Sequence, residues 1–164
     1  MTSIFKTQLS KDAANKKIIV VREFAAPVAK VWAAWTQYSL LDQWWAPKPY
    51  KIVTKSQDFS VGGTWLYSMV GPDNVPMYAL FNYQAIDPGK SYDVTDAFCD
   101  EQGNINTDFP STHWHVVFEP SAAGTKVTVT MSFASEADMN KLIEMGFQEG
   151  FTMAHGNLDE LLQK

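Results

Sequence analysis

Alternating and β-branched runs of residues predict most of the fold. The first run, KKIIVVREF over residues 16–24, is continuous and predicts a buried strand. After residue 50 the pattern alternates, and turn sequences such as GPDN (71–74) and DPGK (87–90) separate its segments. Six further strands are therefore expected, over 50–57, 63–70, 76–86, 91–99, 112–120 and 125–133. Most neighbouring strands should be antiparallel, because short turns connect most of them.

Helical spacing occurs between the first two of these strands. Apolar residues recur at i, i+3, i+4 and i+7 after Pro27 and predict an amphipathic helix, at Val28, Val31, Trp32 and Trp35. A second short helix is expected over 40–45, with Ser39 as its N-cap. Pro47 and Pro49 should end that helix.

A long helix is predicted at the C-terminal end of the chain. Ser135 followed by Asp138 resembles a capping box. Apolar residues then fall on one stripe: Met139, Leu142, Ile143, Phe147, Phe151, Ala154, Leu158, Leu161 and Leu162. A helix of about 28 residues would span roughly 40 Å and could cover one face of the sheet. Gly146, Gly150 and Gly156 lie within it and indicate a bend or a close approach to the sheet.

The composition is that of an ordinary globular domain. The 164 residues are 46% hydrophobic and 19% charged, and no linker or repeat divides them. We expect an N-terminal arm over 1–15 and a single domain over 16–164. The formal net charge of −5 argues against nucleic acid as a partner, because nucleic-acid binding needs a basic face. The sequence contains no apolar run of about 18 residues that predicts a membrane span, no signal peptide and no second cysteine, which favours the cytoplasm.

Several segments resemble the START-like (SRPBCC) superfamily in order and spacing: REFAAPVAKVWAAWT, LLDQWWAP, GGTWLYSM, DPGK, DAFCDEQGN and EMGFQEGFTMAHGNLDELL. The chain is most similar to small bacterial homologues of the activator of heat-shock-protein ATPase. This resemblance implies an α+β helix-grip fold, in which a curved sheet of about seven mostly antiparallel strands wraps a long C-terminal helix and leaves a cavity between them. Superfamily members bind lipids, hormones or polyketides, a few are enzymes, and the eukaryotic domain stimulates a chaperone. The fold alone therefore does not assign the function.

Strand parity predicts which side chains face the long helix. With the bulkier set of each strand turned inward, the inward residues include Trp65, Tyr67, Met69, Tyr92, Phe98 and Trp114. The same parity turns the carboxylate of Asp96 inward. The segment 76–86 is apolar on both faces, so its orientation cannot be assigned. These aromatic residues form either a filled core or the wall of a cavity, and their polar tips favour a cavity of a few hundred Å³.

The predicted ligand site adds residues of the helices to this set. Its members are Trp45, Trp65, Tyr67, Met69, Tyr92, Phe98, Trp114, Phe147, Phe151 and His155. Of the neighbours Trp44 and Trp45, one should pack in the core and the other at the cavity mouth, and we expect Trp45 at the mouth. His155 lies at the edge of the helical stripe. There it either reaches solvent or a backbone carbonyl, or anchors the polar end of a ligand.

Few residues suggest catalysis. The sequence has no GxSxG elbow and no phosphate-binding glycine loop, and we predict no catalytic residue, cofactor or metal ligand. If the strands 91–99 and 112–120 pair in simple register, Cys99 faces His113 on the outer surface of the sheet, with His115 beside it. The simplest interpretation of that group is three solvated polar residues.

The sequence favours a protein that binds a small, mostly apolar molecule between sheet and helix. One alternative is a chaperone-interacting module without a ligand, which would need a large exposed patch. Another is an enzyme that uses the same cavity and would need a base and a group that orients it. Asp96 and His155 are the only inward ionisable candidates, too few to predict an enzyme. The sequence identifies neither the ligand nor the oligomeric state.

Overall fold

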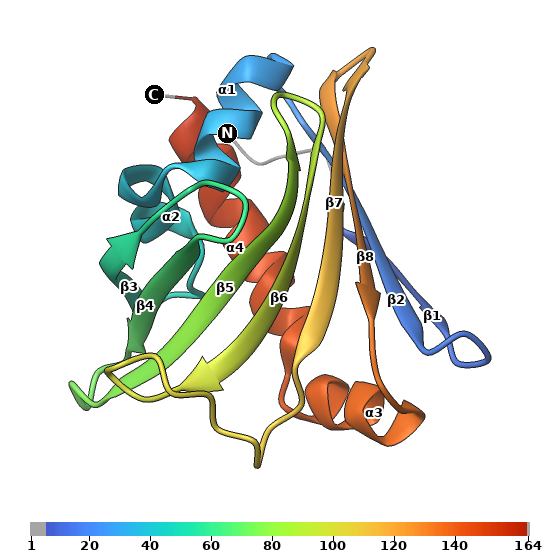
Figure 1. Cartoon of the computed structure of the whole chain (residues 1–164). Helices are drawn as coiled ribbons and strands as arrows, with labels where there is room; N and C mark the ends of the chain where they lie inside the picture. The colour runs from blue at the N-terminus through green and yellow to red at the C-terminus, as the bar shows by residue number, and fades with distance from the viewer. Residues whose placement is uncertain (1–5, 164) are drawn as a thin grey trace.

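A computed structural model describes residues 6–163 and contains one antiparallel sheet with four helices (Figure 1). The strands of the described residues are β1 (Gln8–Asp12), β2 (Lys17–Phe24), β3 (Lys51–Gln57), β4 (Thr64–Val70), β5 (Pro76–Asp87), β6 (Ser91–Cys99), β7 (Thr112–Ser121) and β8 (Gly124–Ser132). The helices are α1 (Val28–Thr36), α2 (Tyr38–Trp44), α3 (Glu136–Glu144) and α4 (Phe147–Leu162). The strand order is β1-β2-β8-β7-β6-β5-β4-β3, so β3 to β8 run as a meander and β2 pairs with the last strand.

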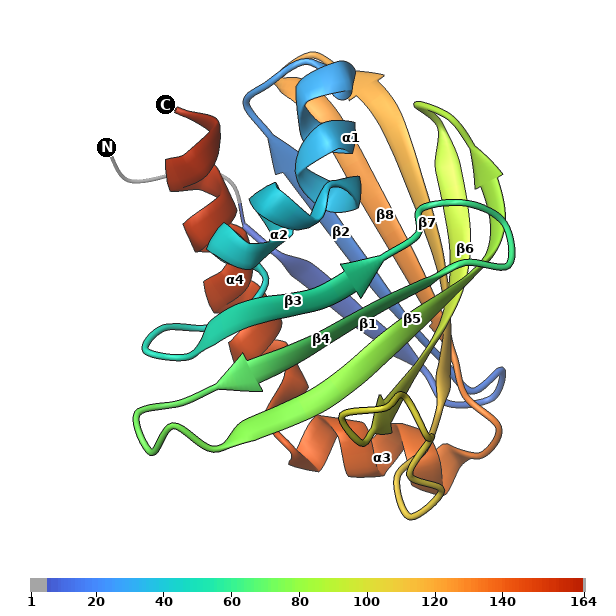
Figure 2. The same cartoon turned by 60° about the vertical axis from the view of Figure 1, so that its left-hand side comes forward.

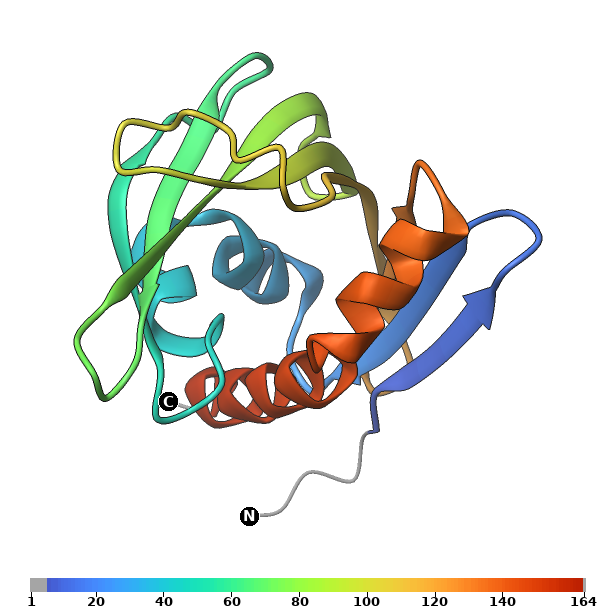
Figure 3. The same ribbon diagram turned by 90° about the horizontal axis from the view of Figure 1, so that it is seen from below.

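The sheet is strongly curved and holds α4 against its concave side (Figure 2). Seen from below, the strands form an incomplete ring that α3 and α4 close, with α1 and α2 inside the far end (Figure 3). The main core lies in this space and includes fully buried Val94, Val116 and Leu158 from strands and helix. This is the α+β helix-grip arrangement that the resemblance to the START-like superfamily implied.

The expected N-terminal arm contains a strand. Gln8–Asp12 pairs antiparallel with β2, from Gln8 opposite Val21 to Asp12 opposite Lys17. The sequence did not predict β1, because Leu9 is the only apolar residue in it. An edge strand needs few apolar side chains when its backbone hydrogen bonds attach it to a buried neighbour. The sheet therefore has eight strands within the described residues, one more than the sequence patterns indicated.

The predicted C-terminal helix is two helices joined at Gly146. Ser135 caps α3 as expected, since its hydroxyl accepts from the backbone N–H of Asp138 at 3.1 Å. The helix α3 ends at Glu144. Gly146 follows with a left-handed φ of 86°, and its N–H donates to the carbonyl of Ile143. Of the two purposes suggested for the glycines, a bend is therefore correct at Gly146.

The cap of α2 differs from the prediction. The helix begins at Tyr38, so Ser39 lies inside its first turn and is not the N-cap. Instead the side chain of Gln57 on β3 accepts a hydrogen bond from the Tyr38 N–H at 2.9 Å and donates one to the carbonyl of Thr36 at 2.7 Å. A side chain 19 residues away in sequence thus satisfies backbone groups at the junction of α1 and α2.

Part of the outer face of β4, β5 and β6 is apolar, and a loop covers it. Leu66, Leu80 and Ala97 form a second, small buried cluster there. The loop over 100–111 reaches this cluster, with Ile105 bridged to Cys99 and the backbone of Gly103 near Leu80. No helix of the described residues is long and apolar enough to cross a membrane.

Candidate ligand site

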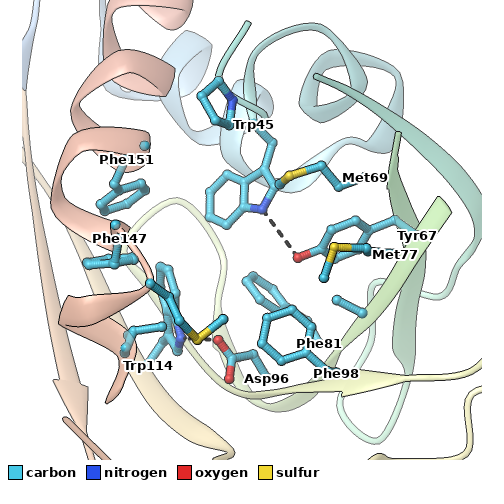
Figure 4. A pocket seen from close by; sticks show the side chains of 16 residues that line it. Trp45, Tyr67, Met69, Met77, Phe81, Asp96, Phe98, Trp114, Phe147 and Phe151 are labelled. Atoms are coloured by element: carbon cyan, nitrogen blue, oxygen red, sulfur yellow. Dashed lines mark hydrogen bonds between the residues drawn. The ribbon is translucent and has the colours of Figure 1, made fainter. Parts of the chain in front are cut away.

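A cavity of about 300 Å³ lies between the sheet and the helices, next to the junction of α3 and α4 (Figure 4). Its walls come from the segment that follows α2, from four strands and from both C-terminal helices. The lining residues are Trp45, Pro47, Tyr67, Met69, Met77, Ala79, Phe81, Asp96, Phe98, Trp114, Leu142, Met145, Gly146, Phe147, Gly150 and Phe151. The volume is at the lower end of the roughly 300–1,000 Å³ that small-molecule pockets occupy.

Strand alternation and register together build the sheet side of the cavity. On β4 the inward residues Tyr67 and Met69 lie directly opposite Ala79 and Met77 of β5. On the next strand, Phe98 lies opposite Ala79. Since residues opposite each other share a face, three neighbouring strands present one continuous apolar surface. Ala79 is the small member of this surface and leaves space that a larger residue would fill.

Trp45 forms the upper wall of the cavity, above Tyr67 in Figure 4. Its indole N–H donates to the hydroxyl oxygen of Tyr67 across 3.4 Å. Its ring lies 5.8 Å from the rings of both Trp114 and Phe151, measured between centroids. The neighbouring Trp44 is fully buried and donates its indole N–H to the carbonyl of Ala34. The two tryptophans therefore divide as expected, with Trp44 in the core and Trp45 facing the cavity.

Asp96 is the only charged residue among the described residues that line the cavity. One carboxylate oxygen accepts from the backbone N–H of Thr112 at 3.0 Å, and the other accepts from the indole N–H of Trp114 at 2.8 Å. Burial raises the pKa of the Asp96 carboxyl from 3.8 to about 6, while these two hydrogen bonds oppose the increase. Burial also raises the pKa of the Tyr67 hydroxyl, so this group stays protonated at neutral pH.

Seven of the ten residues assigned to the ligand site from sequence line this cavity. They are Trp45, Tyr67, Met69, Phe98, Trp114, Phe147 and Phe151. Trp65 lies behind the wall, where its ring stacks on Tyr67 with 4.0 Å between centroids. Tyr92 lies in another part of the core, against the rings of Trp32 and Phe118. Neither of these two residues lines the cavity.

His155 is also outside the cavity, and it does not reach solvent. The side chain is 1% exposed and packs against the rings of Phe24, Trp35 and Phe151. Its Nδ1 atom is 2.7 Å from the hydroxyl oxygen of Thr7, while Nε2 has no hydrogen-bond partner among residues 6–163. Burial, and secondarily the charge of Arg22, lower the pKa of His155 from 6.5 to about 3. The histidine is therefore neutral and lies between α4 and the N-terminal segment.

The proposed pairing of Cys99 with His113 is wrong. A different register of β6 and β7 places Thr95 opposite His113 and Asp93 opposite His115. The carboxylate of Asp93 contacts both imidazoles, at 3.1 Å from Nε2 of His113 and 2.7 Å from Nδ1 of His115. Across the described part of the chain, no group of three histidine, cysteine or acidic side chains could hold a metal ion.

Sequence patterns missed much of the cavity wall. Met77, Ala79 and Phe81 all lie on β5, whose two apolar faces could not be distinguished. The pairing of Val70 with Pro76 would have oriented this strand, because it places Phe81 beside Trp65. Met145, Gly146 and Gly150 were missed because the helix was expected to be continuous. The break at Gly146 brings the end of α3 to the rim of the cavity.

Comparisons with known proteins agree over nearly the whole chain. The family model described as "Activator of Hsp90 ATPase homolog 1-like protein" matches residues 25–163. A crystal structure of a protein from Mycobacterium smegmatis is 29% identical, with a TM-score of 0.88 and 96% of each chain covered. A solution structure of a protein from Arthrobacter aurescens is 32% identical, with a TM-score of 0.88, and covers 95% of this chain and 91% of that chain. No curated protein matches the chain.

A third solved structure, of a protein from Staphylococcus epidermidis, is 28% identical, has a TM-score of 0.83 and covers 95% of this chain and 93% of its own. These three structures resemble the chain in both sequence and fold over nearly its whole length. On this evidence the chain belongs to the activator of Hsp90 ATPase homolog 1-like family, among its small bacterial START-like members.

Proposed function

We propose that this protein binds a small, mostly apolar molecule in the cavity between the sheet and α4. The observation that carries the proposal is the chemistry of the wall. Nearly all lining side chains are aromatic or aliphatic, and polar atoms enter at few points, chiefly the Tyr67 hydroxyl and the Asp96 carboxylate. An apolar wall with a few oriented polar groups is the usual composition of small-molecule sites. We also retain the expectation that the protein works in the cytoplasm.

The rim of the cavity is suited to the entry of a ligand. Met77 and Met145 line it and are about half exposed, at 53% and 46%. Methionine side chains are unbranched and adapt their shape to a neighbouring surface. Pro47 and Gly150 complete this side, and a side chain added at Gly150 would first meet the ring of Pro47. The residue at 150 therefore controls the space available near the rim.

A pair of matched glycine substitutions on α4 tests the proposal. Gly150→Leu places an isobutyl group at the cavity, whereas Gly156→Leu places the same group where no atom lies within 4 Å. Both changes remove a helical glycine, so both favour the helix by a similar amount. The probe is the neutral dye N-phenyl-1-naphthylamine, whose emission rises in an apolar site. We expect saturable binding to the parent protein and to Gly156→Leu, and at least tenfold weaker binding to Gly150→Leu.

Equal affinities of the two leucine variants for the dye would contradict the proposed location of the site. Absence of saturable binding to the parent protein, by the dye and by a panel of aliphatic and aromatic alcohols, would contradict the function itself. Circular dichroism of each variant shows whether a loss of binding comes from the site or from a loss of folded protein.

The family description makes a chaperone partner the second candidate. Large apolar side chains that are exposed in the described residues are spread over several elements, for example Tyr38 on α2, Val53 on β3 and Met153 on α4. The cavity, by contrast, concentrates apolar surface in one place. We therefore expect no change in ATP hydrolysis when the domain is added to the ninety-kilodalton heat-shock ATPase of its host. A saturable increase in the rate would reverse this ranking.

An enzyme is the weakest of the three candidates. Among the described lining residues, Asp96 is the only candidate base, and both of its oxygens accept hydrogen bonds from Thr112 and Trp114. The described lining residues include no serine, threonine, cysteine, lysine or histidine, so they offer no nucleophile of the usual kinds. These residues support binding and orientation of a molecule better than its chemical conversion.

A further inference from the structure

The charge inside the cavity is unbalanced. Asp96 lines an otherwise uncharged wall, and no lysine, arginine or histidine is among the described residues that line it. None of the ion pairs between described residues includes Asp96. An ionised carboxylate that is removed from water needs a cation or a full set of hydrogen bonds, because the loss of its hydration is costly. The described residues supply two hydrogen bonds and no paired cation.

The two hydrogen bonds leave part of the carboxylate available. An ionised carboxylate has about four acceptor positions, and the N–H groups of Thr112 and Trp114 occupy two of them. In Figure 4 the Asp96 side chain lies among the lining residues between Trp114 and Phe98, with one carboxylate oxygen directed at the indole nitrogen of Trp114. Burial raises the pKa of Asp96 only to about 6, so the group is mostly ionised above pH 7. At neutral pH the cavity therefore contains a negative charge with free acceptor positions.

The aromatic wall favours the opposite charge. Trp45, Trp114 and Phe81 are mutual neighbours, with ring centroids 5.5 to 5.8 Å apart, and all three line the cavity. Phe147 and Phe151 face them from α4 (Figure 4). The faces of aromatic rings carry partial negative charge and attract cations, with tryptophan the strongest of them. Aromatic walls around a single carboxylate are a chemical environment suited to an organic ammonium group.

Of the charged side chains beside residues of the rim, Lys48 follows Pro47 but pairs with Glu160 at 3.2 Å, and the two at the junction of α3 and α4 are acidic. Glu144 ends α3 and Glu149 lies in the first turn of α4, on either side of the lining residues Met145 and Gly146. Glu149 occupies a position where the positive end of a helix favours a carboxylate, so it offsets the attraction of that end for an anionic ligand. Lys141, one turn before the end of α3, is directed elsewhere, since its Nζ donates to the carbonyl of Asp108.

We propose that the molecule bound in this cavity is an organic cation, an apolar and preferably aromatic body that carries a protonated amine, with the ammonium group held by Asp96 and the body held by the aromatic wall. This inference rests on the proposed function, because it names the class of ligand for the same cavity. It separates this protein from a carrier of fatty acids, whose carboxylate would meet the negative charge of Asp96.

Three probes of nearly equal shape test the proposal. They are 2-naphthylmethylamine, which is protonated at pH 7.5, the neutral 2-naphthylmethanol, and the anion 2-naphthoate. Isothermal titration calorimetry at pH 7.5 and 150 mM salt gives the affinity of each for the parent protein, for Asp96→Asn and for Asp93→Asn. Asp93 is the matched control, because it lies on the same strand and carries the same charge but contacts His113 and His115 outside the cavity.

We expect the amine to bind the parent protein at least tenfold more tightly than the alcohol, and the naphthoate to bind most weakly. Asp93→Asn should keep this order, and Asp96→Asn should lose the preference for the amine while still binding the alcohol. If the alcohol binds as tightly as the amine, the inference fails and the proposed function stands. If the preference survives in Asp96→Asn, its assignment to Asp96 fails. If none of the three probes binds, the inference fails, and the proposed function is then decided by the titrations with N-phenyl-1-naphthylamine and the alcohols.

Discussion

Replacing Asp96 by asparagine should change how the stability of the protein depends on pH. Burial raises the folded-state pKa of Asp96 from 3.8 to about 6, so between these values the folded protein retains a proton that the unfolded chain has lost. Stability from this group is therefore complete below pH 3.8 and decreases as the pH rises through 6. At about 1.4 kcal/mol per pH unit, the difference between these two pKa values corresponds to about 3 kcal/mol of the free energy of unfolding. Water that enters the cavity reduces this, and we expect a loss of about 1 to 3 kcal/mol.

The measurement is urea unfolding of the parent protein and Asp96→Asn at intervals from pH 4 to pH 8. Asparagine has one acceptor oxygen for the two donors, the Thr112 N–H and the Trp114 indole, so the variant loses a hydrogen bond at every pH. That loss is constant and cancels when the difference between the two proteins is plotted against pH. The free energy of unfolding of the variant should rise relative to the parent up to about pH 7 and then become level. A difference that stays constant over this range would refute the raised pKa of Asp96 in the folded protein.

Two further predictions concern α4 and its junction with α3. His155→Leu should show the opposite dependence on pH, because the folded-state pKa of His155 is lowered from 6.5 to about 3. As the pH falls from 7 to 4.5, the free energy of unfolding of the parent protein should decrease by about 2 to 3 kcal/mol relative to that of the variant. The same variant should bind N-phenyl-1-naphthylamine unchanged, and weaker binding would place the histidine at the cavity after all. Gly146→Ala should lower the free energy of unfolding by about 1 to 2 kcal/mol because φ is 86° there, whereas Gly156→Ala on the exposed face of α4 should raise it by up to about 1 kcal/mol. Equal effects of the two alanines in thermal melts would contradict the role of Gly146 in turning the chain.

Most helices and strands of this fold can be predicted from residue patterns of short range. The alternation in β4 and β7 turned Tyr67 and Trp114 inward correctly, and Ser135 marked the start of α3. Each of these inferences needs only the neighbours along the chain. The resemblance to known sequences then supplied the placement of the helix against the sheet. The parts that failed depend on pairing partners, which no local pattern specifies.

Three features of the structure could not be predicted from local sequence patterns. The register of β6 against β7 was needed to see that Asp93, and not Cys99, meets His113 and His115. The partner of His155 is Thr7, 148 residues away, in a segment whose own strand has almost no apolar pattern. The glycine at 146 carried a signal for a bend, but glycines at 150 and 156 carried the same signal within a continuous helix. Only the backbone angle distinguishes them.

The position of Trp45 also allows ligand binding to be followed by intrinsic tryptophan fluorescence. Its indole ring lies within 5.2 to 6.0 Å of the rings of Trp35, Trp44, Trp65 and Trp114, centroid to centroid. Excitation passes readily between indoles at such separations, so these five rings emit as a coupled group. A bound molecule that quenches the emission of Trp45 should therefore lower the fluorescence of all five tryptophans. Occupancy should therefore be visible in the intrinsic fluorescence of the unmodified chain, without a dye or a label.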